Sequence, residues 1–115
     1  MHGICHIEIP CADFDRAGKF YKTVFDWKTE LIPIMDYMTF KAPDGVGGGF
    51  NKQLKPAPKD VGVFIYIMVE DIEAALKKIE ANGGKVTVKK SPIPGIGHYG
   101  VFIDTEGNSI GLFSA

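Results

Sequence analysis

The strongest constraint on the fold of this chain is an internal repeat with a period of about half its length. The motif DFDRA at residues 13–17 recurs as DIEAA at residues 71–75, an offset of 58 (71 − 13). The turn motif PDG at 43–45 recurs as TEG at 105–107, an offset of 62 (107 − 45). Such self-similarity indicates that one structural unit occurs twice. The four-residue difference predicts a longer loop in the second half, at residues 91–98.

Each half begins with a segment whose alternation is typical of a β-strand, at residues 4–10 and 63–69. The odd positions are mostly aliphatic and are expected to face a helix, whereas the even positions are chemically mixed. An amphipathic helix follows each strand, with Asp13 and Asp71 as the N-caps. The glycines at 83–84 are expected to end the second helix.

Three short strand candidates follow each helix, at residues 28–32, 37–41, 46–52, 85–89, 99–104 and 109–113. Turn residues at 44–45 and 106–108 are expected to join the last two strands of each half as hairpins. This order predicts an α+β fold of two tandem βαβββ modules in a single domain, with module one at about 1–55 and module two at about 61–115. Each helix would cover an antiparallel sheet, and the sheets would curl around a cavity lined by the even positions.

The composition excludes several classes of function. The chain has 115 residues, with 45% hydrophobic residues, 23% charged residues and a formal net charge of −1. Lysine and arginine do not cluster beyond pairs, so neither nucleic-acid nor anionic-membrane binding is expected. No apolar run reaches the roughly 18 residues of a membrane helix, and no signal pattern is present, so a cytoplasmic location is expected. Cys5 and Cys11 are expected to be thiols without a disulfide.

Several runs distributed over the whole chain resemble those of a known superfamily. They are HIEIPCAD at 6–13 with Ala17 and Phe20-Tyr21, FDW at 25–27, VEDIEAAL at 69–76, Gly83-Gly84, IPGIG at 93–97 and FIDTEGNSIGL at 102–112. In this order and spacing they resemble the vicinal oxygen chelate superfamily of glyoxalase, bleomycin-resistance and extradiol-dioxygenase proteins. The middle runs are similar to a glyoxalase-related subgroup of uncertain activity.

The resemblance implies four positions for the ligands of one divalent metal ion, two on the first strands and two on the last strands. The first-strand positions correspond to His6 and Phe64, and the last-strand positions correspond to Gly49 and Gly111. Only His6 has a side chain that can bind a metal. The chain is therefore expected to lack the usual metal-ligand set and the metal-dependent chemistry of glyoxalase I and extradiol dioxygenases.

The candidate catalytic residues are His6 and Glu8, which share a face of the first strand. Together they would form an acid–base pair acting on a small substrate. The alternatives are that His6 is a hydrogen-bonded residue without chemistry and that Glu8 is solvated at the rim of the sheet.

The candidate ligand-binding residues are mainly apolar: Phe64, Tyr66, Met68, Phe113 and His98. The aromatic side chains and the methionine would form the floor of a ligand site, or else fill the cavity as core. His98, with His6 and Glu8, could instead rebuild a site for nickel, zinc, manganese or iron.

The leading hypothesis is therefore a small-molecule-binding protein without a metal cofactor. It would be either a metal-independent enzyme, such as a glyoxalase-related lyase or isomerase, or a binding protein similar to bleomycin-resistance proteins. The alternatives are a metal-dependent lyase, isomerase or dioxygenase that uses His6, and an accessory domain with a filled cavity. The resemblance also implies a homodimer.

Overall fold

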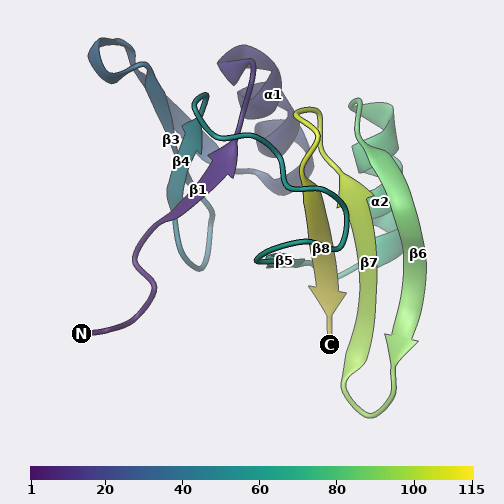
Figure 1. Cartoon of the computed structure of the whole chain (residues 1–115). Helices are drawn as coiled ribbons and strands as arrows, with labels where there is room; N and C mark the ends of the chain where they lie inside the picture. Colours follow the sequence, from purple (N-terminus) through teal and green to yellow (C-terminus); the bar gives the residue numbers. More distant parts are fainter. The chain divides into compact units, whose positions relative to one another are not determined.

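The computed structural model describes residues 1–115 and divides into two compact units, Met1–Pro56 and Ala57–Ala115, called module one and module two below. Both modules contain one strand, one helix and then three strands, which confirms the predicted α+β fold of two βαβββ modules (Figure 1). Each module has its own four-stranded open sheet. A cavity enclosed by both sheets, and the grouping of the modules in a single domain, stay predictions.

The elements of module one are β1 (Ile7–Pro10), α1 (Phe14–Phe25), β2 (Lys28–Ile32), a 3₁₀ helix (Pro33–Met35), β3 (Tyr37–Lys41) and β4 (Gly48–Asn51). Those of module two are β5 (Tyr66–Met68), α2 (Ile72–Ala81), β6 (Lys85–Ile93), β7 (Gly97–Ile103) and β8 (Ser109–Ser114). The strand orders are β1-β4-β3-β2 and β5-β8-β7-β6. The same order in both modules matches the repeat in the sequence.

The sheets are mixed, so the prediction of antiparallel sheets was wrong for the first strand of each module. Strand β1 pairs in parallel with β4, and β5 pairs in parallel with β8. The cause is the connectivity. The helix returns the chain to the end of the sheet where the first strand began and leads into a strand at the opposite edge. Three strands of alternating direction then lead back across the sheet, so the last of them lies beside the first strand and runs in the same direction.

Several predicted boundaries also differ from the structure. Strands β1 and β5 are shorter than the predicted 4–10 and 63–69, because their pairing with β4 and β8 begins only at Ile7 and Tyr66. The insertion expected as a loop at 91–98 instead lengthens the hairpin of β6 and β7, whose register shifts twice between Val86 and Ser91.

Both helices begin at the predicted aspartates. Asp13 accepts a hydrogen bond from the backbone N–H of Arg16 at 3.1 Å, and Asp71 accepts one from Ala74 at 3.0 Å. Each cap stabilises its helix by about 1 kcal/mol. Gly83 follows α2 with a φ of 97°, as the predicted helix end requires. Neither helix has the length and apolar character needed to cross a membrane.

Each helix packs its apolar side against one face of its own sheet. In module one, the ring of Trp27 stacks between Tyr21 and Phe40, at centroid distances of 4.6 and 4.5 Å. In module two, α2 buries Ile72 and Ile79 completely. These cores hold the sheets rigidly and leave the opposite face of each sheet to carry other side chains.

Candidate functional site

The first strand of module one divides its side chains between the two faces of the sheet. Ile9 is buried at 3% exposure, whereas His6 and Glu8 lie on the other face and are exposed. The register places Glu8 beside Gly49, and Gly49 beside Thr39 of β3. Tyr37 shares the Thr39 face because strand side chains alternate. His6, Glu8 and Tyr37 therefore meet on the face opposite α1.

A chain of hydrogen bonds joins four side chains on this face. The His6 Nε2 atom lies 2.7 Å from the Tyr37 hydroxyl oxygen, and that hydroxyl donates to Glu8 Oε2 at 2.8 Å. Asn51 Nδ2 donates to the other oxygen, Glu8 Oε1, at 3.1 Å. We call His6, Tyr37, Glu8 and Asn51 the polar network. Its members come from β3, β4, β1 and the residue just before β1.

The polar network shifts the pKa values of two of its members in opposite directions. The hydrogen bonds from Tyr37 and then Asn51 hold the pKa of Glu8 below its ordinary value of 4.5, against a small opposing effect of burial. Partial burial, followed by the hydrogen bond to Glu8 and the charge of Glu8, raises the pKa of Tyr37 to about 12. At neutral pH, Glu8 is therefore a carboxylate and Tyr37 a protonated phenol.

The lowered pKa of Glu8 makes a contribution to stability that depends on pH. A carboxylate whose pKa is lower in the folded than in the unfolded state stabilises the fold above the unfolded pKa, and this contribution is lost as the pH falls through the folded pKa. The unfolding free energies of the wild type and Glu8→Gln are expected to differ most near neutral pH and to converge as the pH falls through the lowered pKa of Glu8. Urea unfolding across this range measures the difference. In the Tyr37→Phe background, the stability difference between Glu8 and Glu8→Gln should depend less on pH. An unchanged pH dependence would show that the Tyr37 hydrogen bond does not lower the pKa of Glu8.

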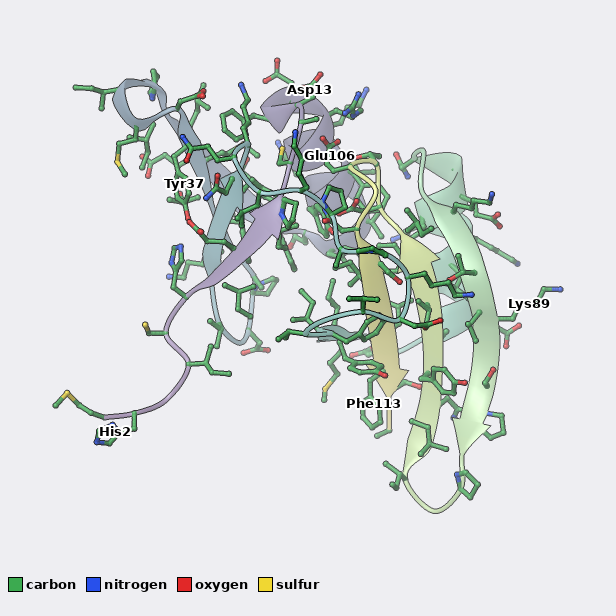
Figure 2. The ribbon with its side chains drawn as sticks, viewed as in Figure 1. His2, Asp13, Tyr37, Lys89, Glu106 and Phe113 are labelled. Atoms are coloured by element: carbon green, nitrogen blue, oxygen red, sulfur yellow. The ribbon has the colours of Figure 1, made fainter.

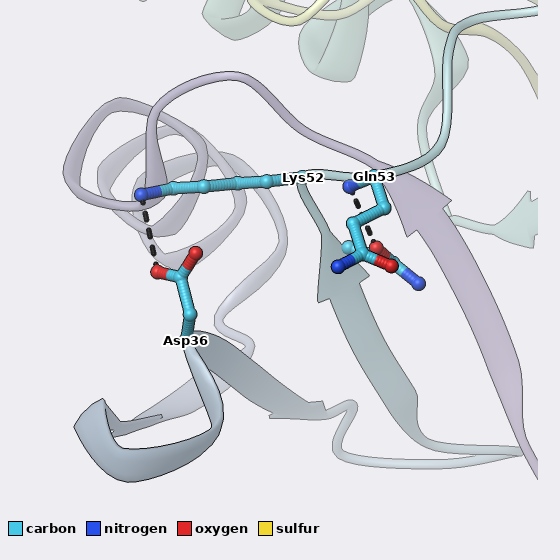
Figure 3. Close-up of polar contacts among 4 residues, drawn as sticks. Asp36, Lys52 and Gln53 are labelled. Atoms are coloured by element: carbon cyan, nitrogen blue, oxygen red, sulfur yellow. Dashed lines mark hydrogen bonds and ion pairs between the residues drawn. The ribbon is translucent and has the colours of Figure 1, made fainter.

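The polar network forms one wall of an open pocket of about 460 Å³, lined by His6, Glu8, Met35, Asp36, Tyr37, Asn51, Lys52 and Gln53. Lys52 Nζ lies 3.4 Å from Asp36 Oδ1 and 4.3 Å from the centre of the Phe14 ring. Asn51 Oδ1 accepts a hydrogen bond of 2.8 Å from the backbone N–H of Gln53 (Figure 3). The pocket thus offers a carboxylate, an amide, an imidazole and an ammonium group to a polar ligand.

Two members of the polar network, Tyr37 and Asn51, are absent from the sequence-based candidates. The alternation of side chains between the two faces of β3 and β4 could have identified both residues, once Gly49 and Thr39 are known to lie beside Glu8. A residue two positions from Thr39 or Gly49 shares their face. Using that signal requires the register of β1, β3 and β4, which alternation within one strand does not supply.

The corresponding face of module two is apolar. Four predicted ligand-binding residues share it: the rings of Phe64 and Tyr66 are 5.1 Å apart, and Met68 lies beside Phe113, which Figure 2 labels near the end of β8. His98 does not join them. His98 pairs with Ser114. Two positions further along β7, Gly100 pairs with Leu112, and this pair faces α2. His98 therefore lies on the helix side of the sheet, away from these aromatic side chains.

The repeat places the polar and the aromatic groups at equivalent positions. The first-strand offset is 58 (66 − 8), and the offset of the last two strands is 62 (111 − 49). In order, His6, Glu8, Tyr37 and Asn51 correspond to Phe64, Tyr66, Tyr99 and Phe113. Tyr37 and Tyr99 are the same residue type, whereas the other three positions are polar in module one and aromatic in module two.

The residues at the expected metal-ligand positions do not fit a divalent ion. A side chain at Gly49 would overlap the Tyr37 ring, and one at Gly111 would overlap the rings of Tyr66 and Phe64. The space of both missing ligands is thus filled by aromatic side chains. His6 Nε2 is hydrogen-bonded to Tyr37, and the chain brings no three His, Cys, Asp or Glu side chains together in an arrangement that could hold a metal.

Comparisons with known proteins agree with the fold. The family model for the Glyoxalase/Bleomycin resistance protein/Dioxygenase superfamily matches residues 3–112. A glyoxylase-like domain-containing protein of Didymella fabae is 36% identical over 118 residues, covering 95% of this chain and 91% of that protein. The fosfomycin resistance protein FosX of Listeria monocytogenes has a similar structure, with a TM-score of 0.82 at 14% identity over 100% of this chain and 92% of that chain.

Glyoxalase I from Zea mays also shares the fold, with a TM-score of 0.74 at 20% identity. The match covers 96% of this chain and 45% of that chain, so the present chain spans about half the length of the maize enzyme. The family model covers nearly the whole sequence, and the structural matches cover both βαβββ modules. The chain belongs to the glyoxalase/bleomycin resistance protein/dioxygenase superfamily.

Proposed function

We propose that this chain is a metal-independent protein that binds a small polar molecule in the pocket of module one. The observation that carries the proposal is the polar network, in which four side chains of a pocket wall are joined by hydrogen bonds. Side chains held in this way need little reordering when a ligand binds, and this lowers the entropic cost of binding. The solved structures that share this fold include glyoxalase I and the fosfomycin resistance protein FosX.

The charges in the pocket favour a ligand with hydrogen-bond donors. Glu8 is an ionised acceptor at the centre of the polar network, and Lys52 is already paired with Asp36. A hydrogen bond to a charged group contributes about 1.5 to 3 kcal/mol. Hydroxyl or amine groups that reach Glu8 and His6 would therefore supply most of the specificity, and the apolar part of Met35 would contact the remainder of the ligand.

The experiment is a screen of small hydroxylated and amino fragments, followed by the amide signals of the ¹⁵N-labelled chain in buffer with EDTA. We expect hits to shift the amides of His6, Tyr37, Asn51 and Lys52, and to do so equally with and without EDTA. In Glu8→Gln the affinity of these hits should fall by about 10-fold or more. Tyr66→Phe, at the equivalent position in module two, is the matched control and should leave the affinity unchanged.

Two results would contradict the proposal. One is a set of hits that shift only the face of module two formed by Phe64, Tyr66, Met68 and Phe113. The other comes from calorimetric titration of nickel, zinc, manganese or iron into the chain. One-to-one binding that disappears in His6→Ala would favour metal-dependent chemistry instead.

A further inference from the structure

We propose that His6 acts through its Nδ1 atom as the base that accepts a proton from the bound ligand, with Tyr37 and Glu8 as positioning residues that fix its tautomer. This inference rests on the proposed function, because it assigns a chemical role to the same pocket. It follows from counting the protons available to the polar network.

The hydroxyl of Tyr37 carries a single hydrogen. That hydrogen is donated to Glu8 Oε2 at 2.8 Å. The Tyr37 oxygen also lies 2.7 Å from His6 Nε2, and in this second bond it can only accept. Nε2 must therefore carry a hydrogen. In the neutral imidazole, the other ring nitrogen, Nδ1, then holds the lone pair.

The protonation states of Tyr37 and Glu8 fix the direction of the hydrogen bond between them. Glu8 is ionised at neutral pH, because even the ordinary pKa of its carboxyl group, 4.5, lies well below 7, and a carboxylate can only accept. The pKa of Tyr37, about 12, keeps its proton in place. With Tyr37 always donating to Glu8, the bond to His6 cannot reverse.

The arrangement suits proton transfer from a ligand. A polarised C–H, O–H or N–H bond of the ligand would break, its proton would move to Nδ1, and the electron pair would stay on the ligand. The resulting imidazolium donates from Nε2 to Tyr37, and the negative charge of Glu8 lies beyond that hydroxyl. Return of the proton to another ligand atom would complete an isomerisation with no oxidant or reductant. A positioned base of this kind contributes about 10²- to 10⁴-fold in rate.

The assignment is tested by two-bond ¹H–¹⁵N correlation spectra of the ¹⁵N-histidine-labelled full chain at about pH 8.5, two units above the ordinary pKa of histidine. We expect His6 to show the pattern of a pure Nε2–H tautomer. The pattern of the Nδ1–H tautomer would overturn the inference, because Tyr37 would then donate to His6. Tyr37→Phe keeps the ring over Gly49 and should give a mixture of tautomers. An unchanged pattern would show that Tyr37 does not position His6.

The site at which His6 is alkylated gives a second readout. Tyr99→Phe, at the equivalent position in module two, is the matched control. Bromoacetate should alkylate His6 at Nδ1, because Nε2 is occupied by its hydrogen bond, and alkylation at Nε2 would overturn the inference. In Tyr99→Phe both the tautomer and the site of alkylation should stay as in the wild type. If fragments still bind module one while His6 is the Nδ1–H tautomer, the base assignment fails and the proposed binding function stands.

Discussion

Gly48→Ala is expected to lower the free energy of unfolding by about 3 to 5 kcal/mol, at the upper end of what a single methyl group can do. The methyl group would overlap the backbone carbonyl of Ile7 on β1. Backbone atoms in a paired strand cannot rotate away as a side chain can. The substitution therefore forces β1 away from β4, its only partner in the sheet.

The effect should extend to the site, because β1 carries Glu8 and follows His6 directly. Urea unfolding measures the stability, and the amide spectrum reports whether β1 is still paired. Gly18→Ala is the matched control, because its added methyl group meets only the end of the Met38 side chain and Thr29 Oγ1 at an ordinary contact distance of 3.4 Å. In the interior of α1 this change is expected to stabilise the chain by about 0.5 to 1 kcal/mol. A loss of less than 1 kcal/mol in Gly48→Ala would contradict the close packing of β1 on β4.

The local elements could be predicted from the sequence because their signals lie within a few residues of one another. Asp13 and Asp71 cap helices at the expected residues, and β2 and β3 have the expected bounds. These features depend on alternation, helical periodicity and turn residues, all of which are visible in a short window. The repeat then extended the prediction from elements to two modules.

The site was predicted only in part because it depends on register. His6 and Glu8 are two residues apart on one strand, so alternation alone puts them on one face. Tyr37 and Asn51 lie 29 and 43 positions beyond Glu8, and they reach it only through the pairing of three strands. The placement of His98 has the same cause. Its face is set by pairing with Ser114, and the sequence around it is a hairpin whose length was not anticipated.

The two glycines at the expected metal-ligand positions have a role that sequence comparison alone does not suggest. An absent side chain can be read as a lost ligand, but in the structure each glycine makes room for an aromatic ring. In module one that ring is Tyr37, and it bridges His6 and Glu8. The absence of a side chain at Gly49 is therefore what admits the ring that completes the polar network, and a side chain at this position should remove the network.

Gly49→Ala is accordingly expected to weaken the binding of polar fragments to module one by about 10- to 100-fold, the loss of one or two hydrogen bonds to charged or partly charged groups. The added methyl group would occupy the position of the Tyr37 ring and hydroxyl, so the ring must swing away from His6 and Glu8. The clash involves the far end of a side chain, so the sheet should stay intact and the unfolding free energy should fall by only about 1 kcal/mol. Amide shifts on fragment titration measure the affinity.

The repeat supplies the matched control for this variant. Gly111→Ala adds the same methyl group at the equivalent position of module two, where it would displace the rings of Tyr66 and Phe64. Because no member of the polar network lies in module two, fragment affinity should stay within about two-fold of the wild type, well below the effect of one lost hydrogen bond. Equal losses in both variants would indicate a general loosening of the fold. Wild-type affinity in Gly49→Ala would mean that the ligand does not depend on the position of Tyr37. Only a loss confined to Gly49→Ala supports the view that Gly49 leaves the space in which the tyrosine lies between the histidine and the carboxylate.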